Sequence, residues 1–190
     1  MVLSKLITPT TREDFYKKTW ETAPLHFERD SSAHFKGLFS KKSFTSIFEN
    51  QTSYLGEDIE INKYVNGTLK TLNGEVAGEV DGAVMQEEER EAIEQGQPAE
   101  AVEVKRGEIW KHINENYTVR LLCPQKYDDL LWGFLAILEQ EFGSRVGCHA
   151  DLTPQGGQGF GVTADSSDSF VVQLKDEAKW TLYAPQPGES

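Results

Sequence analysis

Residues 152–183 constrain the fold of this chain more than any other segment. They begin with a glycine-rich turn and continue through two short apolar runs, at 170–174 and 180–183, with a charged turn between them. Short apolar runs bounded by turn residues are typical of strands joined by tight connections. The pattern therefore predicts antiparallel strands in the C-terminal part of the chain.

Apolar residues at helical spacing predict three helices elsewhere. The first is expected to begin after Thr11 and the second after Ser40, because both residue types cap helices well. The third has an apolar face over residues 130–138 and is expected to end near Gly143. Helices and strands are thus interspersed along the chain, which indicates a mixed α and β fold.

A β-hairpin is predicted around the dipeptide Asn66-Gly67. This dipeptide favours a tight turn between antiparallel strands, and strand-forming residues flank it on both sides. The two strands of the hairpin are expected at residues 59–65 and 69–72. Further strands are predicted at residues 25–29 and 119–124.

An acidic segment interrupts this pattern. Residues 75–103 contain ten acidic residues and one basic residue, Arg90, with scattered glycine and proline. Such a composition is typical of a solvated loop or a transient helix. A docking surface for a basic partner is the alternative interpretation.

The composition excludes several classes of protein. At 190 residues, with 38% hydrophobic and 11% aromatic residues, the chain suits one globular domain. Its net charge of -12 argues against direct nucleic-acid binding, which needs clustered Lys and Arg. The acidic charge is explained either by a basic protein partner or by a need for solubility alone. The sequence shows neither an apolar leader nor a run long enough to span a bilayer, so we expect an intracellular protein with no membrane partner. Cys123 and Cys148 have no metal-ligand spacing and are expected to be buried, reduced thiols.

Several short motifs, taken together, resemble one family. Residues 152–183 are similar to the metal-binding stretch of the Jumonji-C (JmjC) dioxygenases, in the ribosomal oxygenase branch. Other pieces follow the order of that branch from Phe15 to Ser144, and the acidic segment looks like an insertion. The pieces that match without a gap are Leu152-Thr153-Pro154, Gln158-Gly159-Phe160, residues 170–174 and residues 180–183.

The resemblance implies a helical N-terminal portion packed on a partial double-stranded β-helix, the cupin or jelly-roll core. It divides the chain into an N-terminal part of the JmjC domain at 1–74, an acidic insertion at 75–105 and the start of the barrel at 106–190. The family continues through further strands that supply a second histidine and then a winged-helix region. We therefore expect a truncated barrel, as in a fragment, a splice product or a faulty gene model.

The resemblance also implies a function. The family uses Fe(II) and 2-oxoglutarate to hydroxylate a histidyl side chain of a ribosomal protein, and it has been linked to histone lysine demethylation. The implied partners are a ribosomal protein or a histone. The implied location is the nucleus or nucleolus, and a homodimer is implied for the full-length parent of this chain.

The iron and cofactor positions depart from the family pattern. The His-x-Asp iron motif becomes Thr163-Ala164-Asp165, so that only Asp165 keeps a ligand, because a neutral hydroxyl is a poor substitute for imidazole. The lysine that binds the far carboxylate of 2-oxoglutarate is replaced by Ala178, and Lys179 next to it would point to the opposite face of a strand. His149 replaces an asparagine that faces the cofactor pocket.

These residues leave alternatives open. Asp165 is either a remnant metal ligand or a turn cap beside Ser166 and Ser167. His149 either lines the pocket or acts as a substitute metal ligand with Asp165. No catalytic residue is predicted, and the chain is expected to be an inactive member of the oxygenase family. The alternative function is a non-catalytic binding module for a basic protein partner.

Overall fold

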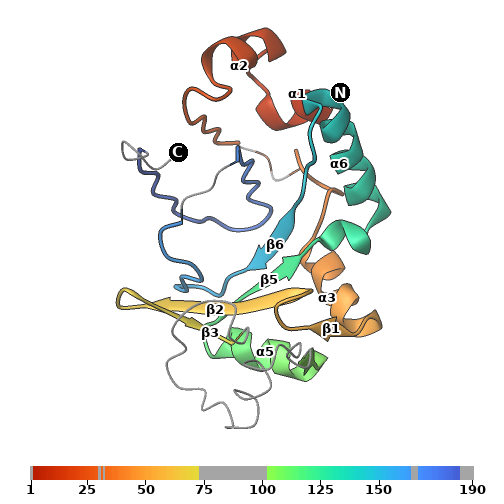
Figure 1. Ribbon diagram of the computed structural model, residues 1–190, viewed down its shortest axis with the longest axis vertical. Helices are drawn as coiled ribbons and strands as arrows, with labels where there is room; N and C mark the ends of the chain where they lie inside the picture. Colours follow the sequence, from red (N-terminus) through yellow and green to blue (C-terminus); the bar gives the residue numbers. More distant parts are fainter. Residues whose placement is uncertain (1, 30, 32, 73–101, 164–166, 185–190) are drawn as a thin grey trace, which may run out of the picture. The chain divides into compact units, whose positions relative to one another are not determined.

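The computed structural model describes residues 2–29, 31, 33–72, 102–163 and 167–184 (Figure 1). The chain forms two compact units. The first comprises residues 1–40, 128–147 and 163–190, and the second comprises residues 41–127 and 148–162. Both helices and antiparallel strands are present, so the expected mixed α and β class is confirmed. The acidic segment lies outside the described residues up to position 101, and its role as an insertion stays a prediction.

A four-stranded antiparallel sheet forms the centre of the second unit, with strand order β3-β2-β5-β6 (Figure 1). The side chains of Ile59, Ile61, Val119 and Leu121 are fully buried. They alternate along two adjacent strands and so line one face of the sheet, which is the core of this unit. The strands are β2 (Ile59–Val65), β3 (Thr68–Thr71), β5 (Thr118–Leu122) and β6 (His149–Leu152).

The predicted hairpin around Asn66-Gly67 is confirmed. Strands β2 and β3 pair antiparallel, and Val65 lies opposite Thr68 across the turn. Asn66 and Gly67 have φ angles of 52° and 84°. Two successive residues with positive φ are the signature of a type I′ turn, which asparagine and glycine tolerate best.

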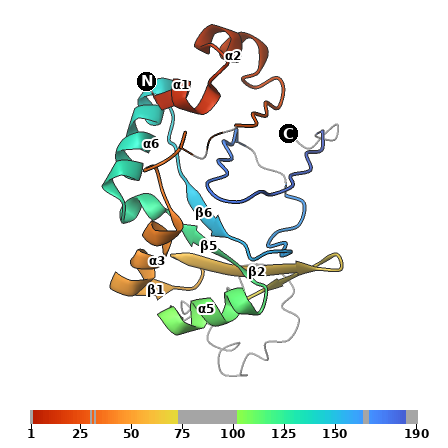
Figure 2. The ribbon, with the colours of Figure 1, turned by 180° about the vertical axis from the view of Figure 1, so that it is seen from behind.

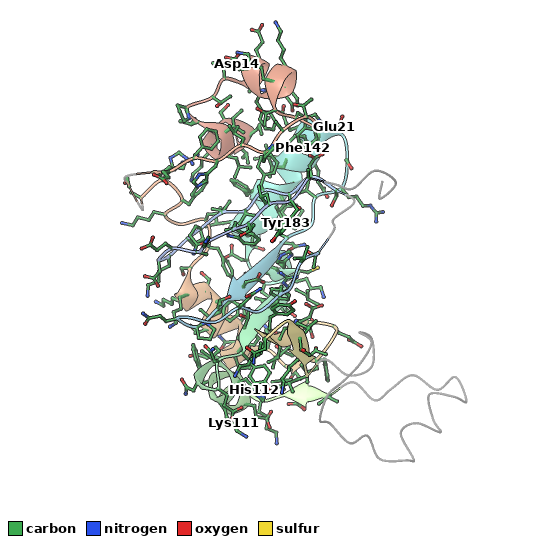
Figure 3. The ribbon with its side chains drawn as sticks, turned by 90° about the vertical axis from the view of Figure 1, so that its left-hand side faces the viewer. Asp14, Glu21, Lys111, His112, Phe142 and Tyr183 are labelled. Carbon is green, nitrogen blue, oxygen red and sulfur yellow. The ribbon has the colours of Figure 1, made fainter. Side chains whose placement is uncertain are left out.

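Two helices and a small second sheet complete this unit. Helix α3 (Lys41–Asn50) buries Phe44, Ile47 and Phe48, as the helical spacing predicted. Helix α5 (Arg106–Asn114) packs against β5 and buries Ile109. Lys111 and His112 project from this helix (Figure 3). The remaining elements are β1 (Ser53–Tyr54), which pairs with β4 (Glu103–Val104), and the short 3₁₀ helix η1 (Pro124–Lys126).

The first unit is helical. It contains α1 (Val2–Ile7), α2 (Arg12–Lys18) and α6 (Asp129–Phe142), and α1 packs against α6 (Figure 2). An aromatic cluster links the ends of these helices, where the rings of Trp20 and Phe142 stack with their centroids 4.7 Å apart. Arg12 forms an ion pair with Glu141, and the Tyr16 hydroxyl donates a 2.8 Å hydrogen bond to the same carboxylate.

Local capping signals define the ends of the helices. Thr11 is the N-cap of α2 and accepts a hydrogen bond from the backbone N–H of Asp14. Asp128 caps α6 by accepting from the N–H groups of Leu130 and Leu131. Gly143 ends α6 with a φ of 63°, as expected for a glycine C-cap. The predicted start of α2 after Thr11 and the predicted end of α6 near Gly143 are therefore confirmed.

Three predicted strands are wrong. Residues 25–29, 170–174 and 180–183 are described, but none of them forms a strand. A strand persists only when its backbone groups pair with a neighbouring strand, and these segments take part in no ladder among the described residues. Among all the described residues, no helix is long and apolar enough to cross a membrane.

Gly159, in the motif Gln158-Gly159-Phe160, should tolerate no side chain. A Cβ atom at this position would lie 2.4 Å from the Cβ of Thr118, whose side chain is buried at 1% exposure. We expect Gly159→Ala to lower the free energy of unfolding by about 1–3 kcal/mol, because the overlap forces a shift of backbone. Chemical denaturation of the two proteins would measure this difference in the free energy of unfolding.

Gly147→Ala is the matched control, since nothing lies within 4 Å of a Cβ at position 147. It should change stability by less than about 0.5 kcal/mol. Equal effects of the two substitutions would contradict close packing at Gly159.

Candidate functional site

The candidate site lies on the face of the sheet opposite the buried core. Strands β5 and β6 pair so that Arg120 lies opposite Asp151 and Leu122 lies opposite His149. On the other side of β5, Arg120 lies opposite Glu60 of β2. Directly opposite residues share a face of an antiparallel sheet, so Glu60, Arg120 and Asp151 form a row across three strands.

Arg120 is the centre of this row. Its Nε and Nη2 atoms donate to the two carboxylate oxygens of Asp151 over 2.8 and 3.0 Å. Its Nη1 atom lies 4.0 Å from a carboxylate oxygen of Glu60. The guanidinium carbon also lies 3.8 Å from the centroid of the Phe160 ring. We call Glu60, Arg120, Asp151 and Phe160 the arginine cluster.

The arginine cluster combines two interactions that arginine makes better than lysine. The fork of the guanidinium matches a carboxylate with two parallel hydrogen bonds, and its flat surface stacks on an aromatic ring. The side chains of Arg120 and Asp151 are only 22% and 26% exposed. Partial shielding from water strengthens the electrostatic attraction between Arg120 and Asp151, so each charge is neutralised mainly by the other.

A second polar network supports the end of β5. One carboxylate oxygen of Asp58 accepts a 3.2 Å hydrogen bond from the Tyr127 hydroxyl and lies 3.5 Å from the ammonium of Lys126. The other accepts from the backbone N–H of Tyr54. Burial, followed by the negative charge of Asp58, raises the pKa of Tyr127 above its usual value. The backbone carbonyl of Asp58 also accepts from the N–H of Leu122, which ties this network to β5.

The structure places the residues predicted from the iron motif only in part. Asp165 lies outside the described residues, together with Ala164 and Ser166. Thr163 is described and exposed, and His149 is exposed at the start of β6. Within the described ranges, no three His, Cys, Asp or Glu side chains come together to form a metal site. The assignment of Asp165 and His149 as metal ligands therefore stays a prediction.

The residues at the cofactor-anchor position are described. Ala178 and Lys179 are both exposed, and the segment that carries them is not a strand. The expectation that Lys179 points away from Ala178 rested on the alternation of a strand. That reason does not hold for the described conformation.

Sequence reasoning missed the arginine cluster. The sequence predicts only a strand at residues 119–124, although a lone arginine between Val119 and Leu121 is a signal that a counter-charge lies nearby. The partner could have been found only from the register of β5 and β6. Phe160 was recognised as part of a motif and not as a surface for the guanidinium.

A double-mutant cycle on Arg120→Ala and Asp151→Ala should measure the strength of the pair. Because the two hydrogen bonds are charge-assisted and largely shielded, we expect a coupling free energy of about 1–2 kcal/mol from urea denaturation.

Lys111 and Glu115 provide the control. Their side chains are 69% and 48% exposed and their charged atoms lie 4.0 Å apart. The same cycle there should give a coupling of less than about 0.5 kcal/mol. A coupling at Arg120 and Asp151 that is no larger than the control would contradict the role given to the arginine cluster.

The chain was compared with known proteins. The family described as "JmjC domain" matches residues 120–190. Ribosomal oxygenase 1 of Bos taurus is 31% identical over 181 residues, which cover 95% of this chain and 23% of the relative. The human protein of the same name is 30% identical, with 95% and 24% covered. The bifunctional lysine-specific demethylase and histidyl-hydroxylase NO66 of Dictyostelium discoideum is 30% identical over 185 residues, which cover 97% of this chain and 31% of the relative.

The chain thus spans about a quarter to a third of the length of these curated relatives. The similarity extends over nearly the whole of the present sequence and includes the sheet that carries the arginine cluster. The colinear motifs, the domain match and the relatives agree: residues 120–190 match the JmjC domain family, and nearly the whole chain is similar to part of the ribosomal oxygenases.

Proposed function

We propose that this chain derives from a 2-oxoglutarate- and Fe(II)-dependent histidyl hydroxylase of ribosomal proteins and is itself catalytically inactive. The printed names of the relatives support the class of activity. The observation that carries the proposed inactivity is the replacement of the family's iron histidine by Thr163. We further propose that the sheet belongs to a partial double-stranded β-helix and that residues 75–105 are an insertion in it.

The described residues do not fit an Fe(II) centre. Non-haem iron oxygenases hold the metal with two histidines and one carboxylate and keep three positions open. Thr163 offers a neutral hydroxyl in place of an imidazole, and the described side chains form no alternative cluster of three ligands. His149 is exposed and stays the candidate for a substitute ligand with Asp165. A site of this kind should bind the metal weakly.

The described residues also do not fit the far carboxylate of 2-oxoglutarate. That group needs a fixed cation, and Ala178 supplies none. Arg120 could bind this carboxylate only by breaking its two hydrogen bonds to Asp151. Asp151 itself places a negative charge beside the arginine. Both features support the proposed lack of turnover.

The second candidate function is a non-catalytic binding module for a basic protein, such as a ribosomal protein or a histone. The net charge of -12 favours it, because complementary charge speeds association with a basic partner. A nuclear or nucleolar location follows from the same resemblance. The homodimer expected for the full-length relatives is also part of the proposal.

Fe(II) binding should respond to Thr163→His. The unmodified chain should bind Fe(II) only in the millimolar range that one carboxylate supports, and the imidazole should strengthen binding. Anaerobic calorimetry would measure both affinities. Thr163→Gln is the control, because glutamine is similar in length to histidine and lacks the imidazole. It should leave the Fe(II) affinity of the unmodified chain unchanged. Equally tight binding by all three forms would contradict the proposal and would indicate His149 as a ligand.

2-Oxoglutarate binding should respond to Ala178→Lys in the Thr163→His background. A buried charge-assisted pair is typically worth about 2–5 kcal/mol, or about thirtyfold to several-thousandfold in affinity. We therefore expect no measurable binding by the unmodified chain and clear binding by the double variant. NMR line broadening of the ligand would measure both. Ala178→Gln in the same background is the neutral control. Micromolar binding by the unmodified chain would show that Lys179 or another cation already serves the cofactor.

A further inference from the structure

The two cysteines of the chain flank the ladder between β5 and β6, Cys123 directly after the end of β5 and Cys148 directly before the start of β6. The last pair of the ladder joins Leu122 to His149. Cys123 follows Leu122 and Cys148 precedes His149, so each cysteine is the first residue beyond this last pair of the ladder. Directly opposite residues of antiparallel strands have Cα atoms about 4.5–5.5 Å apart. Disulfides span Cα separations of about 4.4–6.8 Å, so the register suits such a bond.

The Cys148 thiol lies in a partly buried environment. Burial is the main cause that raises the pKa of the Cys148 thiol to about 11, and Cys123 raises it further. The Cys148 thiol also donates a 3.2 Å hydrogen bond to the side-chain oxygen of Gln125. Both cysteines are free and only partly buried, so small reagents can reach them.

The chain between the two cysteines leaves the unit that contains the sheet and then returns to it. Cys123 has a left-handed conformation, with φ 48° and ψ 51°, and begins the turn into η1. Residues 128–147, which include α6, belong to the helical unit, and the chain re-enters the sheet at Cys148. A bond between the cysteines would therefore close a covalent loop at the two points where the chain crosses between units.

We propose that Cys123 and Cys148 form a reversible intrachain disulfide by exchange with a low-molecular-weight disulfide such as oxidised glutathione. The Cys123 thiolate attacks the small disulfide, forms a mixed disulfide and releases one glutathione thiolate. The Cys148 thiol then loses its proton to solvent and attacks the Cys123 sulfur, which releases the second glutathione. The chain gives up two electrons and two protons, and the small disulfide is reduced to two thiols.

The environment of Cys148 determines the order of these steps. Only a thiolate is nucleophilic, and the buried Cys148 stays protonated at neutral pH. Cys123 is therefore the attacking residue and Cys148 the resolving residue. Because Cys148 immediately precedes His149 and the rest of β6, the bond would fix the start of the strand that carries the candidate site. The inference rests on strand register and is independent of the proposed oxygenase ancestry.

Thiol trapping tests the proposal on the full chain. The protein is equilibrated without oxygen in buffers with different ratios of reduced to oxidised glutathione, quenched with acid, alkylated and weighed by intact mass spectrometry. We expect a monomer with no alkylated thiol and no glutathione adduct in oxidising buffer, and two alkylated thiols in reducing buffer. Two alkylatable thiols at every ratio, or disulfide-linked dimers on a non-reducing gel, would overturn the proposal.

Single-cysteine variants test the order of attack. Cys148→Ser should accumulate a mixed disulfide with glutathione because it lacks the resolving thiol, whereas Cys123→Ser should stay mostly unmodified at neutral pH. The opposite pattern would overturn the assignment of the attacking residue.

Oxidation in urea keeps the test independent of the folding of the variants. The folded chain should form the bond at a lower proportion of oxidised glutathione than the unfolded chain, because the sheet holds the two thiols together. Equal or weaker formation in the folded chain would overturn the cross-strand geometry.

Discussion

Strand β5 holds the sheet together, because it is hydrogen-bonded to β2 on one side and to β6 on the other. Its sequence alternates between two environments. Val119 and Leu121 are fully buried in the core, whereas Arg120 faces the other side and binds Asp151. The apolar face fixes the register, since a slip by one residue would expose the core residues and bury the arginine. The cross-strand pairs that β5 makes with β2 and β6 depend on this register.

The same register determines the chemistry of the exposed face. It brings Glu60 and Asp151 to either side of Arg120 and leaves Phe160 to cover the guanidinium. The positive charge that could attract an anionic cofactor is thereby neutralised within the protein. This arrangement favours a stable sheet over a cofactor pocket. It agrees with the proposal that Thr163 and Ala178 stand where the family has an iron ligand and a cofactor anchor.

Local signals made much of the fold predictable. The Asn66-Gly67 turn, the N-cap of α2 and the C-cap of α6 depend on a few neighbouring residues, and the structure has them where they were expected. The strands predicted at 170–174 and 180–183 depend on pairing with distant segments, which an apolar run cannot specify. The arginine cluster was not foreseen for the same reason, because its members come from three strands and a loop. The sequence did indicate the family, and the altered iron motif stays a prediction. Whether Asp165 and His149 approach each other stays a prediction, because Asp165 lies outside the described residues.

An assay of 2-oxoglutarate turnover by the unmodified chain tests most directly the proposal that this chain lacks the oxygenase activity of the family. The chain would be incubated aerobically with Fe(II), ascorbate and 2-oxoglutarate, with and without a histidine-containing ribosomal-protein peptide, and succinate would be quantified. We predict no succinate above a blank that contains the metal and lacks the protein. Succinate in excess of the protein concentration, abolished by a chelator, would show that the chain assembles a working iron site despite Thr163 and Ala178.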